Sequence, residues 1–150
     1  MEDWSKVIVF GARPEKCIIR PSAYVLIEDE NDRVAVVRSA DGIFLPGGGI
    51  EAGETPEEAI RREALEECGF IIQTGAWLVR AVQFSYSKAE ESYFEKRSTF
   101  VEGTVLGTDF SHLEANHEVI WINPESANQF LSHASQYWAV EQWRNRATRE

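Results

Sequence analysis

Three glutamates near the middle of the chain have the spacing of a metal-binding set. Glu63, Glu66 and Glu67 stand at positions i, i+3 and i+4 of a segment that should be helical, so their carboxylates share one face of that helix. Carboxylates this close repel one another and raise one another's pKa values unless a cation lies between them. Oxygen ligands suit Mg²⁺, for which Mn²⁺ can substitute, and zinc fits less well because no cysteine or histidine cluster accompanies them. Taken alone, a glutamate-rich helix is more often a solvated face, so the neighbouring residues decide.

The residues around these glutamates favour a reaction at phosphate. A glycine run, Gly47 to Gly49, precedes the helix and should form a loop whose backbone approaches a metal or phosphate closely. Arg62 can hold a carboxylate in place, and Glu54 lies at the junction of loop and helix. Bound metal would neutralise phosphate oxygens and activate a water, while a further carboxylate takes the proton from that water. We therefore expect hydrolysis of a diphosphate bond.

Clear start and stop signals predict the helix that carries the glutamates. Thr55 is a suitable N-cap, Pro56 suits the first helical position, and Glu58 completes a capping box. Gly69 predicts the end of the helix after about Cys68. The positions that recur every four residues and should face the core are Ile60, Ala64 and Cys68. The cysteine is therefore read as a small buried hydrophobe and not as a nucleophile.

Extended segments flank this helix on both sides. Runs rich in β-forming residues predict strands at 22–29, 33–38, 43–45, 70–87, 94–106 and 117–122. Residues 124–131 should form a helical turn and residues 132–146 a terminal helix. This order predicts a mixed sheet covered by helices, which is an α/β fold, in a single domain of 150 residues.

The helix and the glycines before it resemble the Nudix box. That pattern is a glycine, five residues, a glutamate, seven residues, and then Arg-Glu-apolar-any-Glu-Glu-any-Gly-apolar. It is met here by Gly48, Glu54, Arg62, Glu63, Ala64, Glu66, Glu67, Gly69 and Phe70. With seven fixed identities at about 7% usage each, a chance match is on the order of one in a million. Ala64 is smaller than the Leu, Ile or Val usual at its position, which affects packing more than chemistry.

The resemblance implies a fold, a reaction and a set of metal ligands. The implied fold is an α/β/α sandwich with a mixed β-sheet, and the implied reaction is Mg²⁺-dependent cleavage of nucleoside diphosphates linked to another moiety. By position, Glu63, Glu66 and Glu67 would be the metal ligands, with the carbonyl of Gly47 as a fourth. Arg62 would orient the glutamates. Residues 118–121, Glu-Val-Ile-Trp, also look like the family.

The catalytic base is left open between two groups of residues. Glu66 and Glu67 are the candidates inside the box, and Glu114 and Glu118 are the candidates outside it. Glu118 is favoured outside the box because it begins a predicted strand whose end can face the site, although a merely exposed strand charge explains it equally well. Glu54 would support the metal ligands or help to activate water.

The substrate is less determined than the reaction. A MutT-like role on nucleoside triphosphates is the first expectation, and a nucleotide sugar or dinucleoside polyphosphate is the alternative. A non-catalytic nucleotide-binding regulatory module on the same fold is a rival, although the complete carboxylate set speaks against it. A calcium-binding domain is a further rival, but its ligands would lie on a helix and not in the usual loop. Aromatic residues flank a polar loop and are candidates for stacking a base or for a homodimer contact, although packing explains most of them better. They are Phe84, Tyr86, Tyr93 and Phe94.

Charge and composition narrow the partners. The net charge of −10 argues against nucleic acid or a membrane surface. A small nucleotide-like substrate remains acceptable, because bound metal reverses the local field. The longest apolar runs are too short to span a bilayer, and the acidic start does not resemble a signal peptide. Cys17 and Cys68 suit a reducing compartment, so we expect a cytoplasmic protein.

Overall fold

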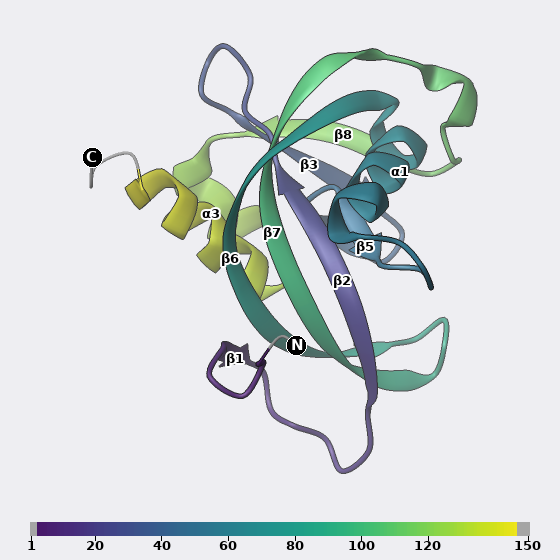
Figure 1. The fold of residues 1–150 in the computed structure, drawn as a ribbon, viewed down its shortest axis with the longest axis vertical. Coiled ribbons are helices and arrows are strands. Elements are labelled where there is room, and N and C mark those ends of the chain that lie inside the picture. The colour runs from purple at the N-terminus through teal and green to yellow at the C-terminus, as the bar shows by residue number, and fades with distance from the viewer. Residues whose placement is uncertain (1–2, 147–150) are drawn as a thin grey trace.

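The computed structural model describes residues 3–146 and arranges them as two β-sheets with helices packed against them (Figure 1). The larger sheet has the strand order β1-β6-β7-β2-β5, and the smaller has the order β4-β3-β8. The strands are β1 (Ile8–Phe10), β2 (Ile18–Leu26), β3 (Val34–Ser39), β4 (Gly42–Phe44), β5 (Gly47–Gly49), β6 (Phe70–Ser87), β7 (Ser92–Thr108) and β8 (Glu118–Ile122). The helices are α1 (Pro56–Cys68), α2 (Ala127–Phe130) and α3 (Ala134–Arg146), with short 3₁₀ turns η1 (Phe110–His112) and η2 (Pro124–Ser126).

Both parallel and antiparallel pairs occur in the larger sheet. Strands β6 and β7 form a long antiparallel hairpin, β2 lies parallel to β7, and β1 lies parallel to β6. The short strand β5 pairs antiparallel with β2 and forms the edge of the sheet. The predicted α/β fold with a mixed sheet between helices is therefore confirmed.

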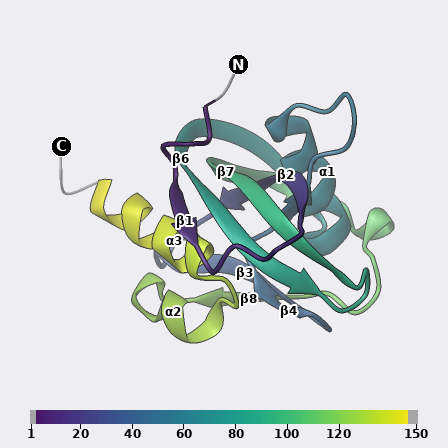
Figure 2. The same ribbon diagram turned by 90° about the horizontal axis from the view of Figure 1, so that it is seen from below.

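Strand β2 contributes buried side chains to the core from both of its faces. Because side chains alternate along a strand, Ala23 and Val25 of β2 point toward α1. With Ile27, just after the strand, they join the buried cluster that contains Ile60 and Ala64. The intervening residues of β2 belong to a second buried cluster, which contains residues of α3. Helices α1 and α3 accordingly lie on opposite sides of the long strands (Figure 2). One strand thus holds both helices in place relative to the sheet.

The ends of α1 follow the sequence prediction. The Thr55 hydroxyl accepts a hydrogen bond from the Glu58 N–H, and the Glu58 carboxylate accepts one from the Thr55 N–H. Gly69 ends the helix in the left-handed conformation, with φ of 71°. The predicted inward face, which includes Ile60 and Cys68, is buried. The polar face of α1 therefore has a fixed direction.

Two segments differ in kind from the sequence prediction, and β2 spans Ile18–Leu26 where a strand was predicted at 22–29. Residues 47–49 form strand β5 and not a loop, because their backbone pairs with Ser22 to Tyr24 of β2. A side chain at Gly47 would overlap the Ala23 carbonyl oxygen, and its φ of 143° disfavours other residues. Strand β1 was not predicted, since only three residues form it and two of them are exposed. Its pairing with β6 is a tertiary contact that no local sequence pattern predicts.

None of the helices between residues 3 and 146 is long and apolar enough to cross a membrane. The cytoplasmic location and the single-domain organisation stay predictions.

Candidate active site

Helix α1 and strand β5 together form the candidate active site. Glu63, Glu66 and Glu67 lie half-buried on one face of α1, as their spacing predicts. The N–H of Gly47 donates a hydrogen bond of 3.0 Å to Oε1 of Glu67. At Gly48, an added Cβ would approach the carboxyl carbon of Glu63 to 3.1 Å. The glycines are therefore needed so that the backbone of β5 can lie directly against the carboxylates.

Arg62 connects the carboxylates to one another and to β5. Its guanidinium donates two hydrogen bonds to Glu54, of 2.8 and 2.9 Å, and one of 2.6 Å to Glu63. Its Nη2 also donates to the carbonyl of Gly49 at 3.1 Å, and Nη1 lies 3.7 Å from the Glu66 carboxylate. The hydrogen bonds from Arg62 hold the pKa of Glu54 down at about 2. Glu54 is thus ionised and positioned next to the cluster.

The three carboxylates of α1 have raised pKa values. Burial is the main cause for Glu67, whose pKa rises to about 8 even though the Gly47 N–H opposes the change, and the charges of Glu63, Glu114 and Glu66 raise it further. Burial also raises the pKa of Glu63, against the hydrogen bond from Arg62, and that of Glu66. A cation placed among these groups would remove the cause of the shifts.

Glu114 joins this cluster from outside α1, and Glu118 does not. The N–H of Glu114 donates a backbone hydrogen bond of 2.7 Å to the carbonyl of Glu66. Its carboxylate raises the pKa values of all three glutamates of α1. Glu118 begins β8, where its side chain is 65% exposed and pairs with Arg38 at 3.3 Å. Of the two bases proposed outside the box, the structure places Glu114 beside the metal-ligand candidates.

The donor set fits a hard divalent cation, but the side chains are not yet arranged around one. Among residues 3–146, no three His, Cys, Asp or Glu side chains form a preformed metal site. Glu63 is turned to Arg62, and Glu67 is turned to the Gly47 N–H. All the donors are oxygens that repel one another, which suits Mg²⁺ or Mn²⁺. The metal-ligand roles of Glu63, Glu66 and Glu67 and of the Gly47 carbonyl stay predictions.

The comparison with protein families matches this arrangement over most of the chain. The model of the NUDIX domain matches residues 18–143, which include α1, β5 and Glu114. The chain belongs to the Nudix family. The resemblance seen in the glutamate spacing therefore extends well beyond the box.

Individual Nudix proteins are similar to this chain over different lengths. The 8-oxo-dGTP diphosphatase of Haemophilus influenzae is 44% identical over 55 residues, which cover 37% of this chain and 40% of that protein. The nucleoside triphosphatase NudI of Enterobacter sp. is 30% identical over 118 residues, which cover 71% of this chain and 77% of that protein. A solved NUDIX hydrolase from Nitrosomonas europaea superposes with a TM-score of 0.69 at 16% identity, over 85% of this chain and 90% of that one. This structural likeness confirms the fold.

The aromatic residues near the 88–91 turn differ in their surroundings. Phe84 and Phe94 are buried, and the guanidiniums of Arg13 and Arg20 lie over their rings at 4.8 and 4.1 Å from the centroids. The two exposed rings, Tyr86 and Tyr93, pack edge to face against each other at 4.9 Å. Packing therefore accounts for both phenylalanines. Base stacking and a homodimer contact through the tyrosines stay predictions.

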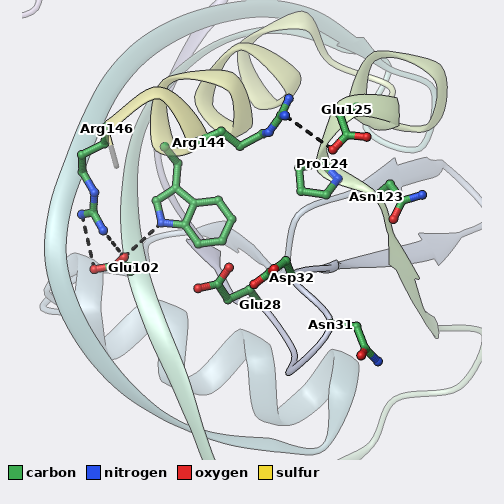
Figure 3. Close-up of a pocket in the computed structure, with 10 residues that line it drawn as sticks. Glu28, Asn31, Asp32, Glu102, Asn123, Pro124, Glu125, Arg144 and Arg146 are labelled. Atoms are coloured by element: carbon green, nitrogen blue, oxygen red, sulfur yellow. Dashed lines mark hydrogen bonds and ion pairs between the residues drawn. The ribbon is translucent and has the colours of Figure 1, made fainter. Parts of the chain in front are cut away.

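A cavity of about 480 Å³ lies away from the glutamate cluster, between the β2–β3 turn and the end of α3 (Figure 3). Several of its lining residues are acidic: Glu28, Asp32, Glu102 and Glu125. The arginines in it are already engaged, because Arg146 pairs with Glu102, and Arg144 lies 3.5 Å from Glu125. The indole N–H of Trp143 also donates to Glu102 at 3.0 Å. Such a lining disfavours an anionic nucleotide, and none of the lining residues belongs to the glutamate cluster.

Proposed function

We propose that the chain hydrolyses a phosphoanhydride bond in a nucleotide derivative, with Mg²⁺ held by Glu63, Glu66 and Glu67. The observation that carries the proposal is the cluster of half-buried carboxylates on α1, with raised pKa values, against the open backbone of β5. Membership of the Nudix family supports it, as do the names of the relatives, an 8-oxo-dGTP diphosphatase and a nucleoside triphosphatase. Mn²⁺ would substitute for Mg²⁺ because both take oxygen ligands.

The residues of the site would have different roles in the reaction. Bound metal supplies charge neutralisation at the phosphate oxygens and lowers the pKa of water. Arg62 holds Glu54 and Glu63 in position through its hydrogen bonds, and the Gly47 N–H holds Glu67. The oxygen of a water attacks phosphorus, the bond from phosphorus to the bridging oxygen breaks, and the leaving phosphate departs.

A carboxylate of the cluster accepts the proton of the attacking water. We assign this role to Glu114 ahead of Glu66 and Glu67. Glu114 lies close enough to influence all three metal-ligand candidates, yet it is not needed among the ligands themselves. It is therefore free to act on a water beside the metal.

The substrate that we propose first is a nucleoside triphosphate. The activity named for the Enterobacter relative, which is similar over most of both chains, supports this choice. A nucleotide sugar or dinucleoside polyphosphate is the second candidate, because the cluster would act equally on any accessible diphosphate.

A panel of nucleotides with Mg²⁺ tests the proposal directly. Turnover by the unchanged protein is compared with that of Glu66→Gln and Glu67→Gln, which keep the side-chain shape but remove a charged ligand. We expect kcat to fall by roughly a hundredfold or more in both variants. Glu141→Gln is the matched control, because Glu141 is an exposed glutamate of α3, and it should keep full activity.

Two results would contradict the proposal. One is undiminished turnover in both variants, which would remove the metal-ligand role. The other is nucleotide binding in a calorimeter with no product after prolonged incubation, which would identify a non-catalytic binding module.

A further inference from the structure

A cavity of about 410 Å³ lies on the other side of β5 from the carboxylate cluster, and its charged lining residues are Arg20, Lys88 and Lys96 together with Asp41 and Glu90. Arg20 of β2 and Lys96 of β7 stand opposite each other in the sheet register, so both point to the same face. Phe44 of β4 and His133, just before α3, close the cavity from the smaller sheet and the helix. In a chain with a net charge of −10, this cavity has more basic than acidic lining residues.

Lys96 has a half-buried side chain whose ammonium has no carboxylate partner. Within residues 3–146, none of its contacts is an ion pair of 4.0 Å or less. The ring of Phe44 faces the ammonium, which lies 5.9 Å from the ring centroid. Burial lowers the pKa of Lys96, the nearby Arg20 charge lowers it further, and Glu90 and Asp41 oppose the change only from a distance. Withdrawing an unpaired cation from water costs free energy, which indicates that a ligand anion completes the site.

The aromatic rings of this cavity are already covered. The Arg20 guanidinium lies over Phe94 at 4.1 Å and donates hydrogen bonds of 2.9 and 3.2 Å to Glu90. The ring of His133 packs edge-on against Phe44 at 5.1 Å. Apart from the exposed Tyr86 at its rim, the cavity therefore offers cationic N–H groups to a ligand, which favours an anionic group.

Strand β5 joins this cavity to the carboxylate cluster. Gly48 faces Glu63, whereas a Cβ at Gly49 would lie 3.5 Å from the Arg20 side chain. The carbonyl of Gly49 in turn accepts a hydrogen bond from Arg62. The buried hydroxyl of Tyr24, one strand inward, is close enough to Glu67, Glu63 and Arg20 for all three to influence its pKa. Glu63 of the cluster and Arg20 of the cavity thus lie against neighbouring residues of the same three-residue edge strand.

We propose that Arg20 and Lys96 bind a second anionic group of the substrate, a phosphomonoester or a carboxylate, on the part of the molecule beyond the scissile diphosphate. The inference rests on the proposed function, since it assumes that the diphosphate lies at the glutamates. It narrows the substrate class to diphosphate compounds that carry such an additional charge. Lys96 makes the ion pair, and Arg20, already held by Glu90, adds hydrogen-bond donors.

Matched substrate pairs that differ in one anionic group test the inference. Coenzyme A differs from dephospho-coenzyme A by one phosphomonoester, and NADPH differs from NADH in the same way. UDP-glucuronate differs from UDP-glucose by one carboxylate. In at least one pair, we expect kcat/KM to be about tenfold higher for the compound with the additional anionic group, as for a charge-assisted hydrogen bond. Lys96→Met should abolish that preference by lowering kcat/KM for the member with the additional anionic group, while kcat/KM for the member without it changes by less than about threefold.

Two further variants separate a specific contact from a general loss of charge. Lys96→Arg keeps the cation and should retain most of the preference. Lys16→Gln removes one positive charge at an exposed position and should leave the preference unchanged. The thermal midpoint of Lys96→Met should not fall, because the substitution removes a desolvated charge.

Binding measured in EDTA separates this inference from the proposed function. If no pair is cleaved, the proposed function fails. The cavity's role would still be supported if the compound with the additional anionic group binds more tightly without metal and Lys96→Met abolishes this difference in affinity. Equal affinity for both members of every pair, or a preference that survives in Lys96→Met, would overturn the inference. The phosphate pairs and the uronate pair show which anion the cavity prefers.

Discussion

Glu54 and Glu67 are two glutamates of one site whose pKa values move in opposite directions. Hydrogen bonds from Arg62 lower the pKa of Glu54 to about 2, whereas burial raises that of Glu67 to about 8. Titratable groups whose environments push their pKa values apart are typical of catalytic sites. Glu54 is thus an anion that anchors Arg62 at any ordinary pH. A cation beside Glu67 would lower this raised pKa, so metal binding and deprotonation should be coupled.

The choice of catalytic base can be tested on single residues. Glu114→Gln should lower kcat by roughly a hundredfold or more, because it removes the carboxylate that we propose takes the proton from water. Glu118→Gln should lower it by less than about threefold, since Glu118 is exposed and pairs with Arg38. Steady-state rates at saturating Mg²⁺ decide the matter. A larger loss in Glu118→Gln than in Glu114→Gln would reverse the assignment.

His133 should make the folded protein sensitive to acid. Burial and, to a smaller extent, the Lys96 charge lower its pKa from 6.5 to about 4. The unfolded chain therefore binds more protons between these two pH values, so stability is complete above pH 6.5 and falls as the pH drops toward 4. The free energy of unfolding, measured with urea, should therefore fall less between pH 7 and pH 4 in His133→Gln than in the unchanged protein. We expect the difference to be roughly 1 to 3 kcal/mol.

Exposed His112 supplies the control for that experiment. His112→Gln should keep the pH dependence of the unchanged protein. An identical decline in His133→Gln and the unchanged protein would show that His133 does not contribute.

At the level of secondary structure, β5 is the element that brings the site together. It has no side chains, so its backbone can lie against Glu63 and Glu67 on one side and near Arg20 on the other. Helix α1 supplies the carboxylates, but without β5 their positions relative to a bound phosphate would be free. A strand of only three residues therefore matters for the site although it contributes little to the core.

Adding one methyl group to β5 should disturb the metal site specifically. In Gly48→Ala the new Cβ would meet the Glu63 carboxylate at 3.1 to 3.2 Å, so that carboxylate must move by a few tenths of an ångström. We expect the Mg²⁺ concentration for half-maximal activity to rise by about tenfold, comparable to the loss of a group that orients a metal ligand. Gly75→Ala, where the nearest atom lies at 3.5 Å, should leave it unchanged. An unaltered Mg²⁺ requirement in Gly48→Ala would show that Glu63 does not bind metal.

Across the whole molecule, charge is distributed unevenly. The chain has a net charge of −10, and both the carboxylate cluster and the cavity of Figure 3 are acidic. The cavity at Arg20 and Lys96 differs from both because its lining includes Lys96, a cation without an ion pair, beside the Arg20–Glu90 pair. The diphosphate of a substrate should therefore bind at the cluster only when metal has neutralised it, whereas an anionic group can bind at Arg20 and Lys96 without metal.

Mg²⁺ should stabilise the whole fold. A ligand that binds only the folded state adds about 2.7 kcal/mol at a concentration of one hundred times its Kd, so the thermal midpoint should rise with Mg²⁺ and return with EDTA. Sodium chloride at equal ionic strength serves as the control for screening. Glu67→Gln should lose most of the Mg²⁺-induced rise, whatever its own midpoint. A midpoint that Mg²⁺ leaves unchanged in the native protein would contradict a metal site.

The sequence alone determined the features that depend on local order. The capping box at Thr55, the stop at Gly69 and the shared face of Glu63, Glu66 and Glu67 all follow from helix geometry, which repeats within a few residues. The Nudix box is a contiguous pattern for the same reason, so the order of residues along the chain is enough to recognise the family. The mixed sheet between helices also followed, because the order of periodic segments limits the architectures available.

Only the tertiary structure decided how distant segments meet. That Glu114 and not Glu118 lies beside the α1 glutamates depends on the path of the chain after β7, where the Glu114 N–H bonds to the Glu66 carbonyl. The pairing of β5 with β2 turned a predicted glycine loop into a strand. Arg20 and Lys96 come from strands far apart in the chain, and nothing in either local sequence marks them. They form one site because parallel pairing of β2 with β7 sets them side by side, and such pairing is fixed by long-range packing and not by local preference.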